Sequence, residues 1–479
     1  MKNLKKTLAL VAALAMSATA LYGCGESSSS SSSKKDSSVA DSSSKDESSS
    51  ESESSSESKA AAEAPELKDD GDKLTILCWN TDDAQPMVDL FCEKTGHKAD
   101  EINIKCFGVQ GGQAAEQYTA YLDKAENDAD LMFLEADWCL QFINDDTKTV
   151  PLESLGFKED DFSALYPYVL EIGKSTTTGA LKGVSWQSAA GGYCYREDLA
   201  EKFLGVKSPE EMQAKVADWD KFKATAKELS DKTEGKTALS ATLGGVWQVY
   251  SGSRPTAWVD EDNKLVVDDY CSDYAEYAKT LWTNNYVTHV AQWTDEWKPL
   301  GQSDDVMGYF VSTWGFGDTI LGAAAGGEGG ATFGKWKCVT GPANFYWGGT
   351  WVAPAASCDN KTIAKEFIEF FTTKEDTAEA YALKKGEYMS NKNVMEKIIK
   401  DKSYAGAPVL GGQNQFEVLN EVAQGIDMTG KITPYDSVIK TEFSNAVQEY
   451  AEGTYETAEE ALEAFKANVA GKITELNWD

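Results

Sequence analysis

The sequence predicts an α/β protein folded into two lobes, and three observations support this class. Short apolar runs alternate with stretches whose apolar residues recur at helical spacing between residues 74 and 143. Such alternation is typical of β-α-β units with parallel strands. The chain after residue 72 has about 400 residues, a length that suits two domains or lobes. The chain also has 14 Trp and 20 Tyr residues, which can serve both a core and a ligand site.

Residues 1–23 are predicted to be an export signal. Lys2, Lys5 and Lys6 precede an uncharged stretch of mostly Ala and Leu that ends in LYGC at 21–24. This end resembles the lipobox of bacterial lipoproteins, which implies cleavage before Cys24 and a diacylglycerol on its thiol. A transmembrane anchor is the alternative, but a stretch of about 17 residues lies at the short limit for a span. We therefore expect a lipid-anchored protein on the extracytoplasmic face of the cell membrane.

Residues 24–72 are predicted to form a disordered tether. More than half of residues 26–58 are Ser, mixed with Asp, Glu and a few Lys, and aromatic residues are absent. Such a segment has too little apolar surface to offset its chain entropy.

The whole chain carries a formal charge of −33. This balance excludes nucleic acid and anionic lipid surfaces as partners, because both require a basic face.

The first elements of the folded part follow one another in a regular order. Apolar runs predict strands at 74–79, 102–109 and 130–134, and helical spacing predicts helices at 87–94, 114–124 and from 138 to 143. Ligands of parallel sheets sit beyond the carboxyl ends of the strands. We therefore expect site residues within 79–82, 108–110 and 135–138.

Later helices carry clear start signals. Ser208 followed by Pro209 and Glu211 indicates a capping box, Asp218 begins the next helix, and Thr373 is expected to cap another. One helix face is expected to pack in the core because its apolar residues share a helical period: Ile363, Phe367, Phe370 and Phe371.

The cysteines after Cys24 are eight in number and form no CxxC pair, so no zinc or thioredoxin-like site is expected. Their even number in an exported chain would suit disulfides. Several lie inside apolar runs, however, where a free Cys behaves as a small core residue. We predict mostly free thiols, no metal site and no cofactor.

Several segments between residues 73 and 479 share their order and spacing with one family. They are LTILCW at 74–79, ADLMF at 129–133, GVSWQ at 183–187, YCYREDL at 193–199, DWDKF at 218–222, WGGTWVAP at 347–354, EYMSN at 387–391 and TAEEAL at 457–462. This series resembles the extracellular solute-binding proteins, the family that includes maltose-binding protein. The sequence departs from that protein at Asp82-Asp83, and residues 241–300 are unusually rich in Trp.

The resemblance implies a two-lobed, type II periplasmic-binding-protein-like fold with three inter-lobe crossings. The crossings are expected near Trp186, Trp347 and Met389. Residues 73–185 would then form lobe 1 and residues 186–346 lobe 2. Residues 347–388 would return to lobe 1, and residues 389–479 would complete lobe 2 with the C-terminal helices.

The candidate ligand-binding residues combine polar groups for sugar hydroxyls with aromatic faces for sugar rings. In lobe 1 they are the strand-end residues Trp79, Asn80, Asp82, Glu135, Asp137 and Trp138. In lobe 2 and the crossings they are Trp186, Gln187, Tyr193, Trp247, Trp314, Trp347 and Trp351. By resemblance, Asp82 and Asp137 occupy hydroxyl-binding positions of the family. Each Trp could equally be partly buried in the core, and Trp219 and Trp282 are assigned to packing.

Arg196 and Arg254 are the only arginines, which disfavours acidic ligands, because carboxylates and phosphates are usually gripped by Arg. The only histidines are His97 and His289, without metal-ligand spacing or a nucleophile motif, so we expect no enzyme.

The prediction is a monomeric lipoprotein that binds a neutral di- or oligosaccharide and serves the permease of an ABC importer. The alternative is a surface lectin or adhesin without a transport role.

Overall fold

The computed structural model describes residues 64–109, 111–402 and 404–478. The predicted signal peptide, Cys24 and the tether up to residue 63 lie outside these residues. The described residues all belong to one compact unit of the chain. Within the described residues, no helix is both long and apolar enough to cross a bilayer.

The first sheet has five strands in the order β2-β1-β3-β9-β4. Their bounds are β1 Leu74–Cys78, β2 Ile102–Cys106, β3 Leu131–Glu135, β4 Val184–Ser185 and β9 Thr350–Pro354. β1 pairs in parallel with β2 and β3, as the alternating pattern predicts. β9 runs antiparallel to β3 and to β4, so the sheet is mixed. The register of β3 and β9 sets Glu135 opposite Thr350.

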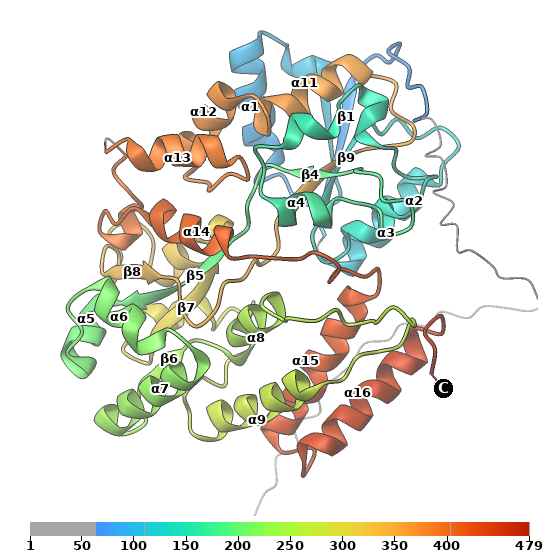
Figure 1. The fold of residues 1–479 in the computed structure, drawn as a ribbon. Helices are drawn as coiled ribbons and strands as arrows, with labels where there is room; N and C mark the ends of the chain where they lie inside the picture. The colour runs from blue at the N-terminus through green and yellow to red at the C-terminus, as the bar shows by residue number, and fades with distance from the viewer. Residues whose placement is uncertain (1–63, 110, 403, 479) are drawn as a thin grey trace, which may run out of the picture. The chain divides into compact units, whose positions relative to one another are not determined.

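Helices from both early and late parts of the chain surround the first sheet, as Figure 1 shows. They are α1 Ala84–Thr95, α2 Gly112–Leu122, α3 Cys139–Ile143, α4 Pro167–Ile172, α11 Lys361–Phe371, α12 Glu375–Lys385 and α13 Lys392–Lys400. Phe367, Phe370 and Phe371 of α11 are buried, which confirms the predicted core face, and Ile363 is partly buried against it.

The second sheet has four strands in the order β6-β7-β5-β8. Their bounds are β5 Gly191–Arg196, β6 Ala238–Ser240, β7 Val306–Ser312 and β8 Trp336–Val339. Its helices, grouped apart from those of the first sheet in Figure 1, are α5 Glu197–Leu199, α6 Pro209–Val216, α7 Trp219–Thr233, α8 Leu243–Gly252, α9 Asp269–Thr283, α10 Leu321–Ala324, α14 Gln415–Gln424, α15 Asp436–Glu452 and α16 Ala458–Lys472.

Short turns of other helix types complete the described chain. They are η1 Ala99–Glu101, η2 Leu152–Leu155, η3 Glu159–Phe162, the π-helical η4 Ala200–Leu204, η5 Lys298–Gln302, η6 Thr313–Gly315 and η7 Pro408–Leu410.

Most of the predicted helix starts are observed. The Ser208 Oγ accepts a hydrogen bond from Glu211 N at 3.3 Å, and Asp218 Oδ1 accepts one from Lys221 N at 2.7 Å. Thr373 is different: α12 begins after Lys374 and no side chain caps it. The backbone N–H of Thr373 instead donates to Glu369 O at 3.1 Å, which keeps this residue at the end of α11.

Ordered structure begins within the segment predicted to be a tether. Gly71 N donates to Asp359 O at 2.9 Å, and Asp69 Oδ1 accepts from Thr362 N at 2.9 Å at the start of α11. These polar groups find partners in the folded unit, which composition alone could not indicate.

The eight cysteines after Cys24 are all free, and six of them are buried, as predicted for core residues.

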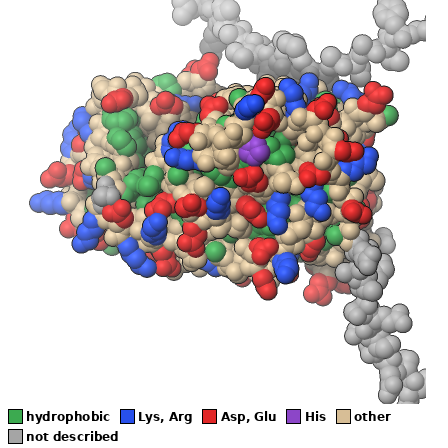
Figure 2. All heavy atoms as spheres, turned by 90° about the horizontal axis from the view of Figure 1, so that it is seen from above, with side chains coloured by type: hydrophobic (Ala, Val, Ile, Leu, Met, Phe, Trp, Pro, Cys, Tyr) green, Lys and Arg blue, Asp and Glu red, His purple; other side chains and the backbone are tan. Residues whose placement is uncertain are grey.

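The surface reflects the acidic composition. On the face shown in Figure 2, acidic and basic side chains are interspersed, and the described residues form no continuous basic patch there.

Candidate functional site

A cavity of about 250 Å³ lies where the end of β3, helices α8 and α15, and the segment before β9 meet. Its lining residues come from four separate parts of the chain and are Asp137, Trp247, Gln248, Ser251, Gly252, Tyr346, Trp347, Gly348, Ser437, Lys440, Thr441, Ser444 and Asn445. Asp137 follows a strand of the first sheet, and α8 packs on β7 of the second, so groups attached to both sheets line one space.

Two carboxylates stand at the end of β3. Asp137 N donates to Glu135 Oε2 at 2.9 Å within the strand end. Ala136 N donates to Gly349 O at 3.0 Å, and this bond holds the strand end against the segment before β9. Burial raises the pKa of Glu135 well above its usual range, and the charge of Asp137 raises it further.

Lys440 of α15 provides the cationic group of the cavity. No hydrogen bond or ion pair involving its Nζ is found among the residues that the structure describes. Burial lowers the pKa of Lys440, but the neighbouring Tyr346, Asp436 and Asp137 outweigh this effect, so the pKa lies above its ordinary value. The side chain is therefore charged at neutral pH and has donors available for a ligand.

An aromatic wall continues from the cavity. Trp347 lines it and contacts Trp314 edge to face, with ring centroids 5.1 Å apart, while Trp314 Nε1 donates to Trp347 O at 2.9 Å. Gly348 follows with a positive φ of 61°. A Cβ at Gly348 would lie in ordinary contact with Glu135 Oε1, at 3.4 Å, so the positive φ rather than a lack of space favours glycine here.

A buried amide ties together the segments that were predicted to cross between lobes. Gln187 Nε2 donates to Glu387 Oε2 at 3.1 Å, and Gln187 Oε1 accepts from Thr350 N at 3.0 Å. Backbone bonds reinforce the junction, since Ser390 N donates to Trp186 O at 2.7 Å. Glu387 is only 2% exposed, and this burial raises its pKa to about 7.

The structure brings together only some of the predicted site residues. Asp137, Trp247 and Trp347 line the cavity, and Glu135 and Trp314 adjoin it. The remaining predicted site residues do not line the cavity.

Three predicted aromatic residues are core residues, each fully buried. Trp351 Nε1 donates to Val169 O at 2.9 Å, Tyr193 OH donates to Leu239 O at 2.6 Å, and Trp186 packs on Phe133 with ring centroids 5.1 Å apart. These side chains have no exposed surface to offer a ligand, so the site prediction is corrected at the three positions. Gln187 is likewise buried, in the junction described above.

The residues near the end of β1 do not line the cavity. Trp79 contacts Trp138 edge to face at 5.8 Å between ring centroids, and Trp138 packs further on Tyr118. Asn80 Oδ1 accepts from Asp82 N at 3.0 Å in an exposed turn. None of these residues lines the cavity.

Sequence reasoning missed Lys440, Tyr346 and the polar residues of α15. Those residues recur at helical spacing: Ser437, Lys440, Thr441 and Ser444. The stripe was visible in the sequence, but every amphipathic helix has such a polar face. Only the packing of α15 beside Asp137 distinguishes this stripe from a solvated surface.

Comparisons with known proteins were consistent with this architecture. The family model described as "Bacterial extracellular solute-binding protein" matches residues 87–407. No curated protein is significantly similar in sequence. A solved structure described as an extracellular solute-binding protein of family 1 has a TM-score of 0.71 at 16% identity, covering 83% of this chain and 99% of that one.

Two further solved structures contain sugars. The ABC transporter associated binding protein of B. animalis subsp. lactis, in complex with β-1,6-galactobiose, has a TM-score of 0.63 at 16% identity and covers 83% of this chain and 96% of its own. A maltose-bound protein of T. maritima has a TM-score of 0.60 at 16% identity and covers 84% of this chain and 100% of its own. At these identities the likeness establishes the two-lobed fold.

Proposed function

The chain belongs to the bacterial extracellular solute-binding proteins, and on that premise we propose that it captures a neutral di- or oligosaccharide for an ABC importer. The observation that carries the proposal is the cavity in which Asp137, Lys440 and Trp347 meet. These groups come from distant parts of the chain and surround a space of about 250 Å³. The family is one of binding proteins, so the site is considered for recognition rather than for catalysis.

The chemistry of the cavity suits a sugar. A pyranose presents hydroxyl groups at its edge and flat C–H faces, which pair with polar and aromatic side chains respectively. Asp137 offers acceptors, Lys440 and the hydroxyl and amide groups of α15 offer donors, and Trp247 and Trp347 offer aromatic surface. Similar folds bound to galactobiose and to maltose support the same ligand class.

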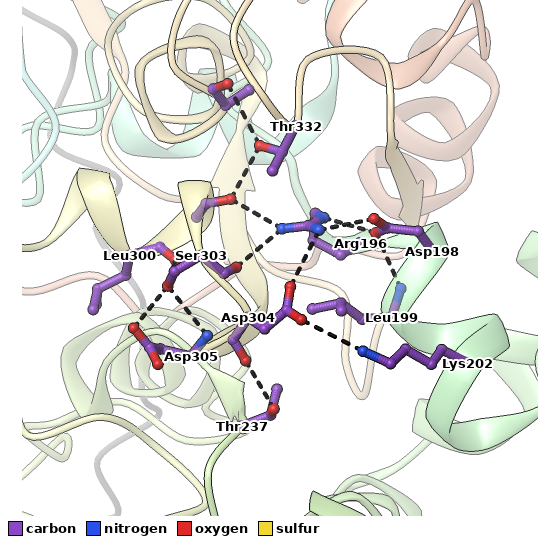
Figure 3. A network of polar contacts seen from close by, with 12 residues as sticks. Arg196, Asp198, Leu199, Lys202, Thr237, Leu300, Ser303, Asp304, Asp305 and Thr332 are labelled. Carbon is purple, nitrogen blue, oxygen red and sulfur yellow. Dashed lines mark hydrogen bonds and ion pairs between the residues drawn. The ribbon is translucent and has the colours of Figure 1, made fainter.

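The arginines support a ligand without negative charge. Arg196, 3% exposed, donates to both carboxylate oxygens of Asp198 at 2.7 and 2.8 Å, and also to Ser303 O at 3.0 Å (Figure 3). Arg254, 5% exposed, donates to both oxygens of Asp268 at 3.1 Å. Both guanidinium groups are thus committed to internal partners. Neither arginine lines the cavity; its cationic lining residue is Lys440, whose charge neighbouring carboxylates balance.

We further propose that ligand binding closes the two lobes. The predicted lobes, 73–185 with 347–388 and 186–346 with 389–479, would rotate about the junction at Gln187 and Glu387. A ligand held by Asp137 on one side and by α15 on the other favours the closed form, because only there do both sides contact it.

Diacylglycerol on Cys24 would anchor the chain in the membrane. The residues between Cys24 and Asp69 would set how far the folded unit can extend from that anchor.

Titration calorimetry tests the ligand class. The panel comprises malto-, cello-, xylo- and manno-oligosaccharides, with glucose and sialic acid for comparison. We expect heat of binding from at least one neutral oligosaccharide series and none from sialic acid. Binding of sialic acid alone would overturn the proposed ligand. The absence of binding to every neutral saccharide would overturn the proposed function as a sugar receptor.

Small-angle scattering tests the closure. The radius of gyration of the protein should fall when the best ligand of the panel is added at saturation. An unchanged radius at full occupancy would contradict the hinge motion and leave the ligand assignment in place.

A further inference from the structure

Trp293 is the most exposed large apolar side chain of the described residues, at 54%. Its backbone φ is +68°, in the left-handed region. This region is a genuine outlier for a bulky residue and costs conformational energy that the surrounding structure must offset. The ring leaves more than half of its surface in solvent, so burial alone does not account for a Trp on this strained backbone. Such outliers concentrate at ligand-binding sites.

The neighbours of Trp293 connect it to the cavity. Its ring lies 6.0 Å from that of Trp347 and 6.2 Å from that of Trp314, measured between centroids, and it is tilted by only 21° from Trp314. Trp297, which is 1% exposed, packs edge to face against it at 4.8 Å. Trp347 lines the cavity and Trp314 is held by the Trp347 carbonyl. Trp293 therefore extends the same aromatic wall into solvent.

We infer that Trp293 is an outer stacking platform of the ligand site, which covers a second sugar ring while Trp347 covers the first. Trp297 contacts the ring of Trp293 edge to face and Trp314 lies nearly parallel to it, while 54% of Trp293 stays exposed and is available to the C–H face of a pyranose. The inference rests on the proposed function and adds to it a ligand of at least two rings. Trp293 would then make the affinity depend on the number of rings. A monosaccharide bound at Trp347 would leave the outer platform empty.

Calorimetry on single variants tests this inference. Trp293→Ala is compared with wild type for the best-binding oligosaccharide of the neutral panel and for the monosaccharide of the same series. We expect the variant to bind the oligosaccharide about tenfold more weakly, as loss of one aromatic stacking contact implies. Affinity for the monosaccharide should change less than twofold, and Trp293→Tyr should restore most of the oligosaccharide affinity.

Two further variants separate recognition from folding. Trp293→Gly removes the side chain and tolerates a positive φ, so its melting temperature should equal or exceed that of wild type while it loses the same affinity as Trp293→Ala. Trp478→Ala, at a residue 41% exposed near the C-terminus, is the matched control and should bind like wild type.

The outcomes distinguish the inference from the proposed function. Equal oligosaccharide affinity in Trp293→Ala and wild type would overturn the outer platform while the sugar receptor stands. An equal loss for the monosaccharide and the oligosaccharide would also overturn it, because Trp293 would then support the inner site. Failure of wild type to bind any saccharide would overturn the proposed function itself.

Discussion

Gln187 Nε2 donates a hydrogen bond of 3.1 Å to Glu387 Oε2, joining residues that are 200 positions apart in the chain. The other end of the same amide accepts from Thr350 N at 3.0 Å. One buried side chain thus fixes the relative positions of three segments, and both groups of the amide are satisfied.

Replacing Gln187 should destabilise the protein because it leaves a carboxyl and a backbone N–H buried without their partner. For Gln187→Leu we expect the free energy of unfolding to fall by about 1–3 kcal/mol, the usual cost of unsatisfied buried polar groups. Urea denaturation followed by circular dichroism measures this. Gln424→Ala, at an exposed end of α14, is the control and should change stability by less than about 0.5 kcal/mol. Equal effects in both variants would contradict the role of the junction.

Glu387 should make stability depend on pH. Burial raises its pKa from 4.5 to about 7, so between these values the folded state holds a proton that the unfolded state has released. Stability contributed by this proton is fully present below pH 4.5, is lost as pH rises towards 7, and then stays constant. Glu387→Gln, which resembles the protonated form, should therefore be more stable than wild type above pH 7, by up to about 3 kcal/mol.

Measuring the difference between the Glu387→Gln variant and wild type across this pH range isolates the residue from other buried carboxyls. Asp83 and Lys385 also face it, the former raising and the latter lowering its pKa. A stability difference that does not change with pH would show that Glu387 is ionised throughout.

Removing the ammonium of Lys440 should weaken ligand binding. A hydrogen bond from a charged donor contributes about 1.5–3 kcal/mol, so Lys440→Met should lower saccharide affinity by about 10- to 100-fold. Calorimetry with the best ligand of the panel provides the measurement. Lys466→Met, on an exposed position of α16, serves as the control and should bind like wild type. Unchanged affinity in Lys440→Met would remove this residue from the site.

Two tryptophans four positions apart should behave in opposite ways. Trp347→Ala should weaken saccharide binding by about 1–3 kcal/mol and leave the protein folded, because Trp347 lines the cavity. Trp351→Ala should lower the free energy of unfolding by about 3–5 kcal/mol, because its ring is fully buried. Thermal unfolding and calorimetry on both variants check this pair, and the reverse pattern would contradict the assignment.

The sequence by itself determined the local elements and the class of fold. Apolar periodicity located β1, β2 and β3 to within a few residues, and capping residues such as Ser208 and Asp218 marked where helices begin. These features depend on interactions between residues close in the chain, so a single sequence records them. The ordered motifs also identified the family, and a carboxylate after β3, Asp137, was expected in the site and lines the cavity.

Only the tertiary structure decided which aromatic residues lie in the core and which line the candidate cavity. Trp351 lies in β9 between β3 and β4 and is covered, whereas Trp347 precedes Gly348 and Gly349, whose φ values of 61° and 103° carry the chain around to the cavity. Lys440 becomes a candidate site residue because α15 packs beside Asp137, about 300 residues earlier in the chain. Burial and charge at these positions arise from contacts between distant segments, and no local pattern encodes them.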